Sequence, residues 1–247
     1  MIKGAQKLLR RLFIGSGVTG VYPTHAAALA AVPKTRKVGY DNPETSNMYP
    51  FLLELSRVSD FAALFYLSQL ATPGYRIFDF GGNTGVLFYN YQRRWIMPPR
   101  LQWTVCDVPA VIEAGCEFAK TRPSEGLSFT SDFADAAGAD LLFTSGTLQY
   151  VPETLAELVA KLGNAKPRHV LVNRTALWDS ETFFTLQSLG PVVCPYRVQN
   201  RKEFVTGMEE QGYRIKDTWD CPESKINVRW HIHHRVRAYA GFLLERG

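Results

Sequence analysis

The sequence predicts an α/β fold with a doubly wound, mostly parallel sheet, a terminal antiparallel hairpin and an N-terminal helical extension. From Tyr75 onward, short apolar and aromatic runs alternate with helical patterns, which is typical of a parallel sheet with helices on both faces. Near the end of the chain, two strand candidates follow one another with only a loop between them. The first 70 residues instead carry the apolar spacing of helices.

The elements of the core follow one another at short intervals. The expected strands are residues 76–80, 101–107, 127–131, 140–145 and 169–175, followed by the hairpin strands 213–220 and 236–246. The expected helices are residues 86–95, 109–120, 152–162 and 201–212. Between Thr175 and about Asn200 the apolar residues follow neither the helical nor the strand period clearly, so this stretch is expected to be irregular. The succession indicates a Rossmann-like core over residues 71–247.

Residues 1–70 are expected to form the helical extension, which can act as a lid. Residues 50–70 have helical spacing, and the turn-rich segment 33–47 interrupts the pattern. Residues 3–13 resemble a basic amphipathic helix, which either packs on the domain or touches a membrane surface. Glycines dilute the apolar stretch after Arg11, which argues against a signal peptide and favours a cytoplasmic protein. No apolar run approaches the roughly 18 residues of a transmembrane segment.

Charge and cysteine content narrow the classes of function. The formal net charge is +5, and the excess is spread along the chain. A basic chain can bind nucleic acid, and the segment 225–237 is the candidate for such a face, although no nucleic-acid partner is expected. The four cysteines show neither a CxxC pair nor tight spacing to histidines, so they are interpreted as buried thiols and no metal site is expected.

A glycine turn follows the first core strand, in the sequence RIFDFGGNTGVLF (residues 76–88). The glycines do not fit the G-x-G-x-x-G pattern of dinucleotide binding, and no Lys-Ser or Lys-Thr follows them as in a P-loop. The spacing that is present instead is an acid and a glycine separated by one residue, followed by a second glycine after three more residues. The pattern is similar to the first motif of class I S-adenosylmethionine-dependent methyltransferases. It consists of Asp79, Gly81, Gly82, Asn83 and Gly85.

The motif predicts how each part would meet that cofactor. Glycines let the backbone approach the methionine and ribose groups closely, and Asp79 is predicted to bond the methionine amino group. Asp107, at the end of the second strand, is predicted to accept from both ribose hydroxyls, unless it caps the following helix. Asp132 is predicted to meet the adenine amino group, or is a turn residue, while Phe133 lines the adenine ring. Ser145, after the fourth strand, completes the predicted cofactor contacts.

Most of the chain resembles one family of class I methyltransferases, whose genes often lie in bacterial surface-polysaccharide or secondary-metabolite regions. The resemblance is carried by GVYPTHAAALAA (20–31), GYDN (39–42), DFGGNTG (79–85), WTVCDVP (103–109), SGTLQYV (145–151), NRTAL (173–177) and YAGFLLER (239–246). It implies the class I methyltransferase fold and S-adenosylmethionine as cofactor but says little about the acceptor, which is expected to be a small molecule or a glycan precursor. The family tends to have an acid before Arg-Thr, where this chain has Asn173, so a base at that position is in doubt.

Acceptor residues are expected at the ends of the fourth and fifth strands and in the segments that cover them. The candidates are Gln149, Tyr150, Arg174, Thr175, Gln187 and Tyr196. Tyr150 and Arg174 are assigned to catalysis, although Tyr150 can also be packing and Arg174 either pairs with a carboxylate or grips an anionic substrate.

The segment HIHH (231–234) is the only histidine cluster in the chain. His233, with His231 beside it on the same face, is predicted to take the proton from a hydroxyl acceptor, unless the segment is a solvated loop. O-methylation is therefore favoured over N-methylation. The competing functions are a nucleic-acid-binding or nucleic-acid-modifying protein and a catalytically silent, methyltransferase-like partner subunit.

Overall fold

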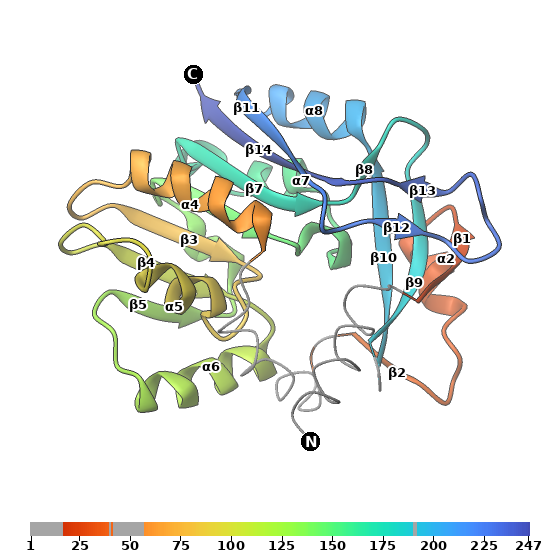
Figure 1. Ribbon diagram of the computed structural model, residues 1–247, viewed down its shortest axis with the longest axis horizontal. Coiled ribbons are helices and arrows are strands. Elements are labelled where there is room, and N and C mark those ends of the chain that lie inside the picture. Colours follow the sequence, from red (N-terminus) through yellow and green to blue (C-terminus); the bar gives the residue numbers. More distant parts are fainter. Residues whose placement is uncertain (1–16, 40, 42–56, 190–191) are drawn as a thin grey trace.

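The computed structural model describes residues 17–39, 41, 57–189 and 192–247. Its main element is a seven-stranded sheet in the order β11-β14-β7-β6-β3-β4-β5 (Figure 1). The strands are β3 (Arg76–Phe80), β4 (Gln102–Cys106), β5 (Leu127–Thr130), β6 (Leu141–Ser145), β7 (His169–Thr175), β11 (Tyr213–Cys221) and β14 (Tyr239–Arg246). The first five of these pair in parallel, and β14 runs antiparallel between β7 and β11. The structure confirms the predicted α/β class, the parallel core and the terminal hairpin.

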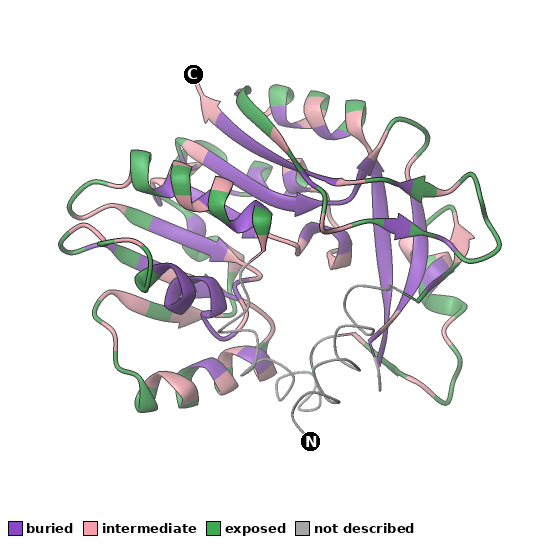
Figure 2. Ribbon diagram, viewed as in Figure 1, coloured by how far each residue is buried: buried purple, intermediate pink, exposed green. Residues whose placement is uncertain are grey.

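Helices cover both faces of this sheet. They are α4 (Val58–Leu70), α5 (Val86–Gln92), α6 (Pro109–Thr121), α7 (Leu155–Ala160) and α8 (Arg201–Glu210). Neighbouring strand residues point to opposite faces: Phe78 packs in the cluster that contains α7 and α8, and Ile77 in the cluster that contains α4 and α5. Because both faces of the sheet's centre are covered, β3, β6 and β7 are largely buried, as Figure 2 shows, whereas the edge strand β11 is mostly exposed.

A second sheet lies beside the first and combines distant parts of the chain. It contains β1 (Val18–Tyr22), β2 (Lys37–Val38), β8 (Leu177–Trp178), β9 (Phe183–Leu189) and β10 (Val192–Asn200). The stretch up to Asn200, which was expected to be irregular, is therefore mostly strand. Both long strands are buried, but Gln187 and Arg197 are among their buried side chains and interrupt the apolar pattern by which a strand is recognised.

The N-terminal extension is not purely helical. It contains α2 (His25–Ala30) and α4, but also β1 and β2, which join the second sheet. The helix α4 packs against β7 and β11, so it belongs to the core. The basic segment 3–13 lies outside the described residues. Among the residues that the structure does describe, no helix is long and apolar enough to cross a membrane.

Candidate functional site

A cleft of about 760 Å³ lies at the carboxyl ends of β3, β4 and β6 and extends to the second sheet. Its core-side wall includes Phe80, Gly81, Asp107 and Ser145. Its opposite wall includes Gln187 of β9 and Tyr196 of β10. In an open, mostly parallel sheet, ligands bind beyond the carboxyl ends of the strands, so this cleft is the candidate site.

The glycine turn lines the cleft, and close packing leaves no room for a side chain at two of its glycines. A Cβ on Gly81 would lie 2.0 Å from Oγ1 of Thr147, and a Cβ on Gly82 would lie 2.4 Å from Oδ2 of Asp79. Gly81, Gly82 and Asn83 line the cleft, whereas Gly85 precedes α5 as its left-handed cap and does not. The backbone from Gly81 to Asn83 is thus accessible to a ligand in the cleft.

Asp79 lies beneath this turn and does not line the cleft. Its side chain is 1% exposed, and its Oδ2 accepts a hydrogen bond from Nε1 of Trp103 at 3.0 Å. Burial raises the pKa of Asp79 to about 7, against the Trp103 hydrogen bond, which lowers it. The structure therefore does not bring Asp79 to the position predicted for it, because the backbone of Gly82 covers the carboxylate.

Asp107 does line the cleft, two residues before α6 begins. Its Oδ2 accepts from the backbone N–H of Asn83 at 3.0 Å, and its Oδ1 accepts from that of Val108 at 2.8 Å. Burial raises the pKa of Asp107 to about 6, and the two backbone hydrogen bonds oppose that rise. Each carboxylate oxygen keeps a further lone pair for a ligand. These bonds fix Asp107 against the glycine turn.

Asp132, the third predicted acid, and Phe133, which follows it, differ in whether they line the cleft. Asp132 accepts from the backbone N–H of Ala134 at 2.8 Å, caps a short 3-10 helix (Phe133–Ala136) and does not line the cleft. The turn alternative therefore describes its side chain. Phe133 lines the cleft with its ring edge-on to Phe80, at a centroid distance of 5.0 Å. An aromatic wall is present at the expected place.

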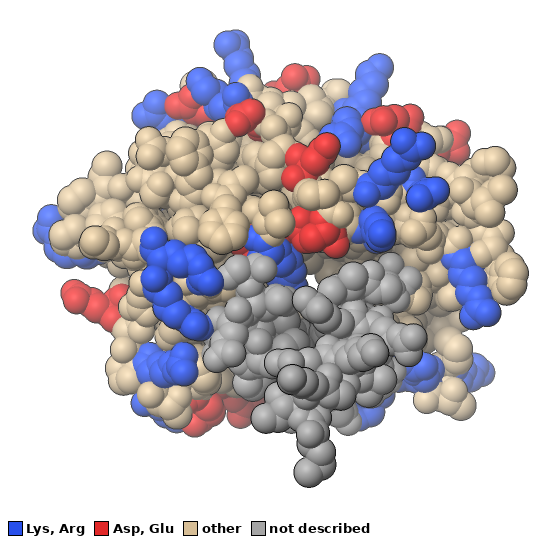
Figure 3. Space-filling view, in the orientation of Figure 1, with Lys and Arg blue, Asp and Glu red and all other residues tan. Residues whose placement is uncertain are grey.

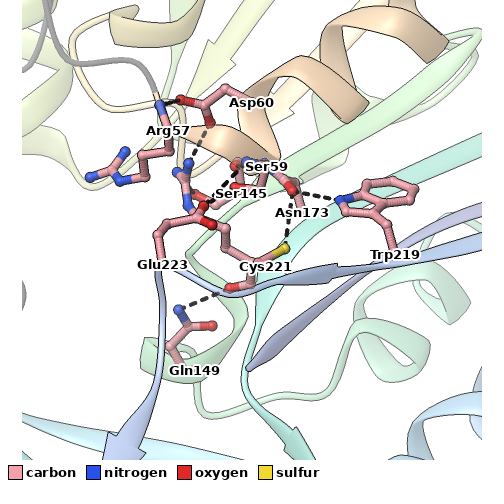
Figure 4. A network of polar contacts seen from close by, with 10 residues as sticks. Arg57, Ser59, Asp60, Ser145, Gln149, Asn173, Trp219, Cys221 and Glu223 are labelled. Atoms are coloured by element: carbon pink, nitrogen blue, oxygen red, sulfur yellow. Dashed lines mark hydrogen bonds and ion pairs between the residues drawn. The ribbon is translucent and has the colours of Figure 1, made fainter. Parts of the chain in front are cut away.

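Arg174 belongs to a buried polar network between β7, α4 and the hairpin, of which Figure 4 labels Asp60, Asn173 and Trp219. Its Nη1 lies 2.5 Å from Oδ1 of Asp60, so the pairing alternative describes it, although the residue also lines the cleft. Asn173 donates to Ser145 Oγ at 3.1 Å, while its amide oxygen accepts from Trp219 Nε1 at 3.1 Å. Asn173 is 0% exposed and thus holds β6, β7 and β11 together rather than facing a substrate.

Four predicted acceptor residues meet at the wall between the two sheets. The Tyr150 hydroxyl donates to Oε1 of Gln187 at 2.6 Å, and its ring stands edge-on to Tyr196 at 5.0 Å. Gln149 donates from Nε2 to the carbonyl of Arg174 at 3.4 Å. All four line the cleft. Thr175, by contrast, is 4% exposed, pairs with Ala240 inside the sheet and does not line it.

The histidine cluster lies away from the cleft. His231 and His233 are exposed on the turn between β12 (Ile226–Asn227) and β13 (Arg235–Val236), and neither lines the cleft. The solvated-loop alternative therefore describes both. His234 packs its ring against Trp178 and Phe183. No group of three or more His, Cys, Asp or Glu residues within the described ranges could hold a metal ion.

The polar residues that line the cleft and that the sequence did not single out include His25, Arg57 and Glu223. His25 begins α2 and packs edge-on to Phe184 of the second sheet. Burial lowers its pKa from the usual value, as does the charge of Arg197. His25 lies within a segment quoted for the family resemblance, but only the unforeseen second sheet brings it to the site.

Comparison with known proteins shows which fold this chain has. The sequence matches no family model and no curated protein. Its structure is similar to mitomycin 7-O-methyltransferase, with 17% identity and a TM-score of 0.56 over 84% of this chain and 59% of that chain. It is also similar to magnesium protoporphyrin IX methyltransferase from Synechocystis PCC 6803 with bound SAM, with 12% identity and a TM-score of 0.55 over 84% and 94%.

This fold carries more than one reaction. The cyclase SpnF is also similar to the chain, with 13% identity and a TM-score of 0.51 over 75% of this chain and 79% of that one. The present chain spans only about 59% of the length of the mitomycin enzyme. Function therefore has to be argued from the site itself. What the strand order and these likenesses establish is that the chain has the Rossmann-like fold of the class I methyltransferases.

Proposed function

We propose that the protein is an S-adenosylmethionine-dependent methyltransferase that acts on a small-molecule acceptor. The observation that carries this proposal is the pairing of an open glycine turn with a carboxylate at the next strand end. Asn83 of the turn donates to Asp107, so backbone and acid form one rigid edge of the cleft. The similarity to a methyltransferase structure with bound SAM supports the same cofactor.

The cleft residues fit the parts of this cofactor. Gly81 and Gly82 would lie against its methionine and ribose groups, Asp107 would accept from the ribose hydroxyls, and Phe133 would cover the adenine ring. Asp132 is left as a cap because Ala134 already engages its side chain. The bound cofactor supplies a methyl group on a sulfonium, and the protein's part is to orient the acceptor and exclude water.

The acceptor is proposed to bind between Tyr150, Gln187 and Tyr196, on the side of the cleft formed by the second sheet. These residues offer aromatic faces and hydroxyl and amide groups, which suit a small molecule or glycan precursor with a hydroxyl. For such an acceptor we assign the base to His25, whose imidazole lines the same wall and whose lowered pKa keeps it neutral at pH 7. It would receive the hydroxyl proton.

Transfer of label from methyl-labelled S-adenosylmethionine to a panel of small phenols, alcohols and amines tests this function. His25→Gln should lower kcat for a hydroxyl acceptor by about 10²- to 10⁴-fold, and the acidic limb of its pH profile should flatten. That limb is set by His25 together with the nearby charges of Arg197 and Glu153.

His233→Gln is the matched control, because His233 is exposed on its turn and should leave turnover unchanged. Full activity of His25→Gln with loss of activity in His233→Gln would return the base to the histidine cluster. Binding of the cofactor without transfer to any acceptor would favour a silent partner subunit.

The nucleic-acid alternative has less support. On the face drawn in Figure 3, Lys and Arg side chains are interspersed with acidic ones rather than gathered in one stripe. The segment 225–237 carries a single aromatic residue, Trp230, so it lacks the interleaved aromatics of a single-strand binding surface. Salt-dependent binding of a generic oligonucleotide would favour this alternative.

A further inference from the structure

The amino-acid end of the proposed cofactor carries two opposite charges, an α-ammonium and an α-carboxylate. The sequence assigned the ammonium to Asp79, but that carboxylate lies beneath Gly82 and outside the cleft. A charged group that leaves water needs a partner of opposite sign. The charged residues that line the cleft include one acid and one base suited to this purpose, Glu223 and Arg57. Of the other cations in the lining, Arg174 is paired with Asp60, and Lys225 is exposed.

Glu223 lies in the connection after β11 and is anchored by one of its two oxygens. Oε1 accepts from the backbone N–H of Ser59 at 3.3 Å and also from the Ser59 hydroxyl. Oε2 is buried and has no hydrogen-bond partner among the described residues. A buried, unpaired carboxylate oxygen is costly unless a donor reaches it, and a ligand ammonium is such a donor.

Arg57 precedes α4, and its guanidinium points away from the carboxylate of Asp60 (Figure 4). The Asp60 carboxylate is already engaged by Arg174 and by the backbone N–H of Arg57 at 2.8 Å. The positive charge of Arg174, with burial, lowers the pKa of Arg57 to about 10. The carboxylates of Asp60 and Glu223 oppose this lowering, but Asp60 is engaged by Arg174. If a ligand ammonium takes up the charge of Glu223, the guanidinium of Arg57 is left to bind an anion of the same ligand.

A chain of contacts connects Glu223, on the same side of the cleft as Arg57, to the glycine turn. Ser59, which holds Glu223, is followed by Asp60, which pairs with Arg174. Arg174 in turn donates from Nη2 to the carbonyl of Ser145 at 3.4 Å, at the end of β6. Thr147, two residues further on, packs against Gly81 of the glycine turn. The charged residues are therefore linked by direct contacts to the open backbone of that turn.

We propose that Glu223 and Arg57 form a zwitterion site, in which Glu223 Oε2 accepts from the α-ammonium of the cofactor and Arg57 donates to its α-carboxylate. This inference rests on the proposed cofactor and assigns its amino-acid end. Arg174 is not part of the pair, because Asp60 holds its guanidinium.

Calorimetric titration with three nucleosides tests the two contacts separately. S-adenosylhomocysteine carries both charged groups, decarboxylated S-adenosylhomocysteine keeps only the amine, and 5′-methylthioadenosine has neither, while all three share an uncharged thioether. Glu223→Gln should weaken the first two by about 10- to 100-fold and leave 5′-methylthioadenosine within about twofold. Arg57→Met should weaken only S-adenosylhomocysteine, by a similar factor. Glu210→Gln, an exposed site on α8, is the matched control and should bind all three as the wild type does.

The outcomes separate this inference from the proposed function. If the wild type binds none of the three nucleosides, the cofactor assignment itself fails. If the wild type binds S-adenosylhomocysteine and Glu223→Gln binds it equally well, Glu223 is not in the site. If Glu223→Gln loses 5′-methylthioadenosine to the same extent, the substitution has disturbed the whole cleft and the zwitterion site is overturned.

Discussion

Replacing Arg174 by methionine should lower the free energy of unfolding by about 3 to 5 kcal/mol. The Arg174 side chain is 10% exposed and that of its partner Asp60 is 4% exposed, so the change leaves a buried carboxylate without its counter-charge. The loss is larger than the worth of the ion pair itself, because the remaining charge bears the full desolvation penalty.

Chemical denaturation of the wild type and three variants isolates the effect of the buried charge. Arg174→Met combined with Asp60→Asn should recover most of the lost stability, since a neutral amide still accepts from the backbone N–H of Arg57. Arg201→Met is the control: it breaks an exposed pair with Asp179 and should change the free energy of unfolding by less than about 1 kcal/mol. Equal losses in Arg174→Met and the double variant would show that packing, not charge, stabilises this network.

Asp79→Asn should make the protein more stable than the wild type, and the gain should grow between about pH 4 and pH 7. The pKa of Asp79 is raised from 3.8 to about 7 in the folded state by burial. Between these values the unfolded chain ionises while the folded one stays protonated, so wild-type stability falls as pH rises and the full cost is present above about pH 7. The total difference is on the order of 4 kcal/mol.

The measurement is the free energy of unfolding of both proteins at pH 4, 5, 6, 7 and 8. Asp107, whose pKa is also raised, is present in both, so the difference reports Asp79 together with its electrostatic interaction with Asp107. Asparagine can still accept from Trp103, which keeps the geometry beneath the turn. A difference that does not vary with pH would mean that Asp79 is ionised in the folded protein.

The parallel core was predictable because its strands are apolar runs buried on both faces, and each ends at a polar or glycine residue. The second sheet was not, because its order depends on pairing between distant segments: Val18 of β1 lies opposite Gln187 of β9. Buried polar residues such as Arg197, which donates to the carbonyls of Leu148 and Glu153, further weaken the strand pattern. Long-range pairing of this kind leaves no local signal.

Some residues of the site were likewise predictable from the sequence, and others were not. Gly81 and Asp107 were predictable because a strand end followed by a glycine or acid places them at one edge of the sheet. Asp79 belongs to the same motif, yet the sequence does not show that the turn folds over its carboxylate. His25 and Glu223 come from segments whose position depends on the second sheet and the hairpin connection. His233 was chosen for its chemistry, but its turn is exposed.

Calorimetric titration with S-adenosylhomocysteine tests the central claim, that the glycine turn and Asp107 hold this cofactor, most directly. We expect saturable 1:1 binding to the wild type, weakened by about 1 to 3 kcal/mol in Asp107→Ala, where charge-assisted hydrogen bonds are lost. Asp132→Ala should bind as the wild type does, because Asp132 caps a turn outside the cleft. Unchanged affinity in Asp107→Ala would remove Asp107 from the site. Binding of NADH with no response to S-adenosylhomocysteine or S-adenosylmethionine would contradict the account as a whole.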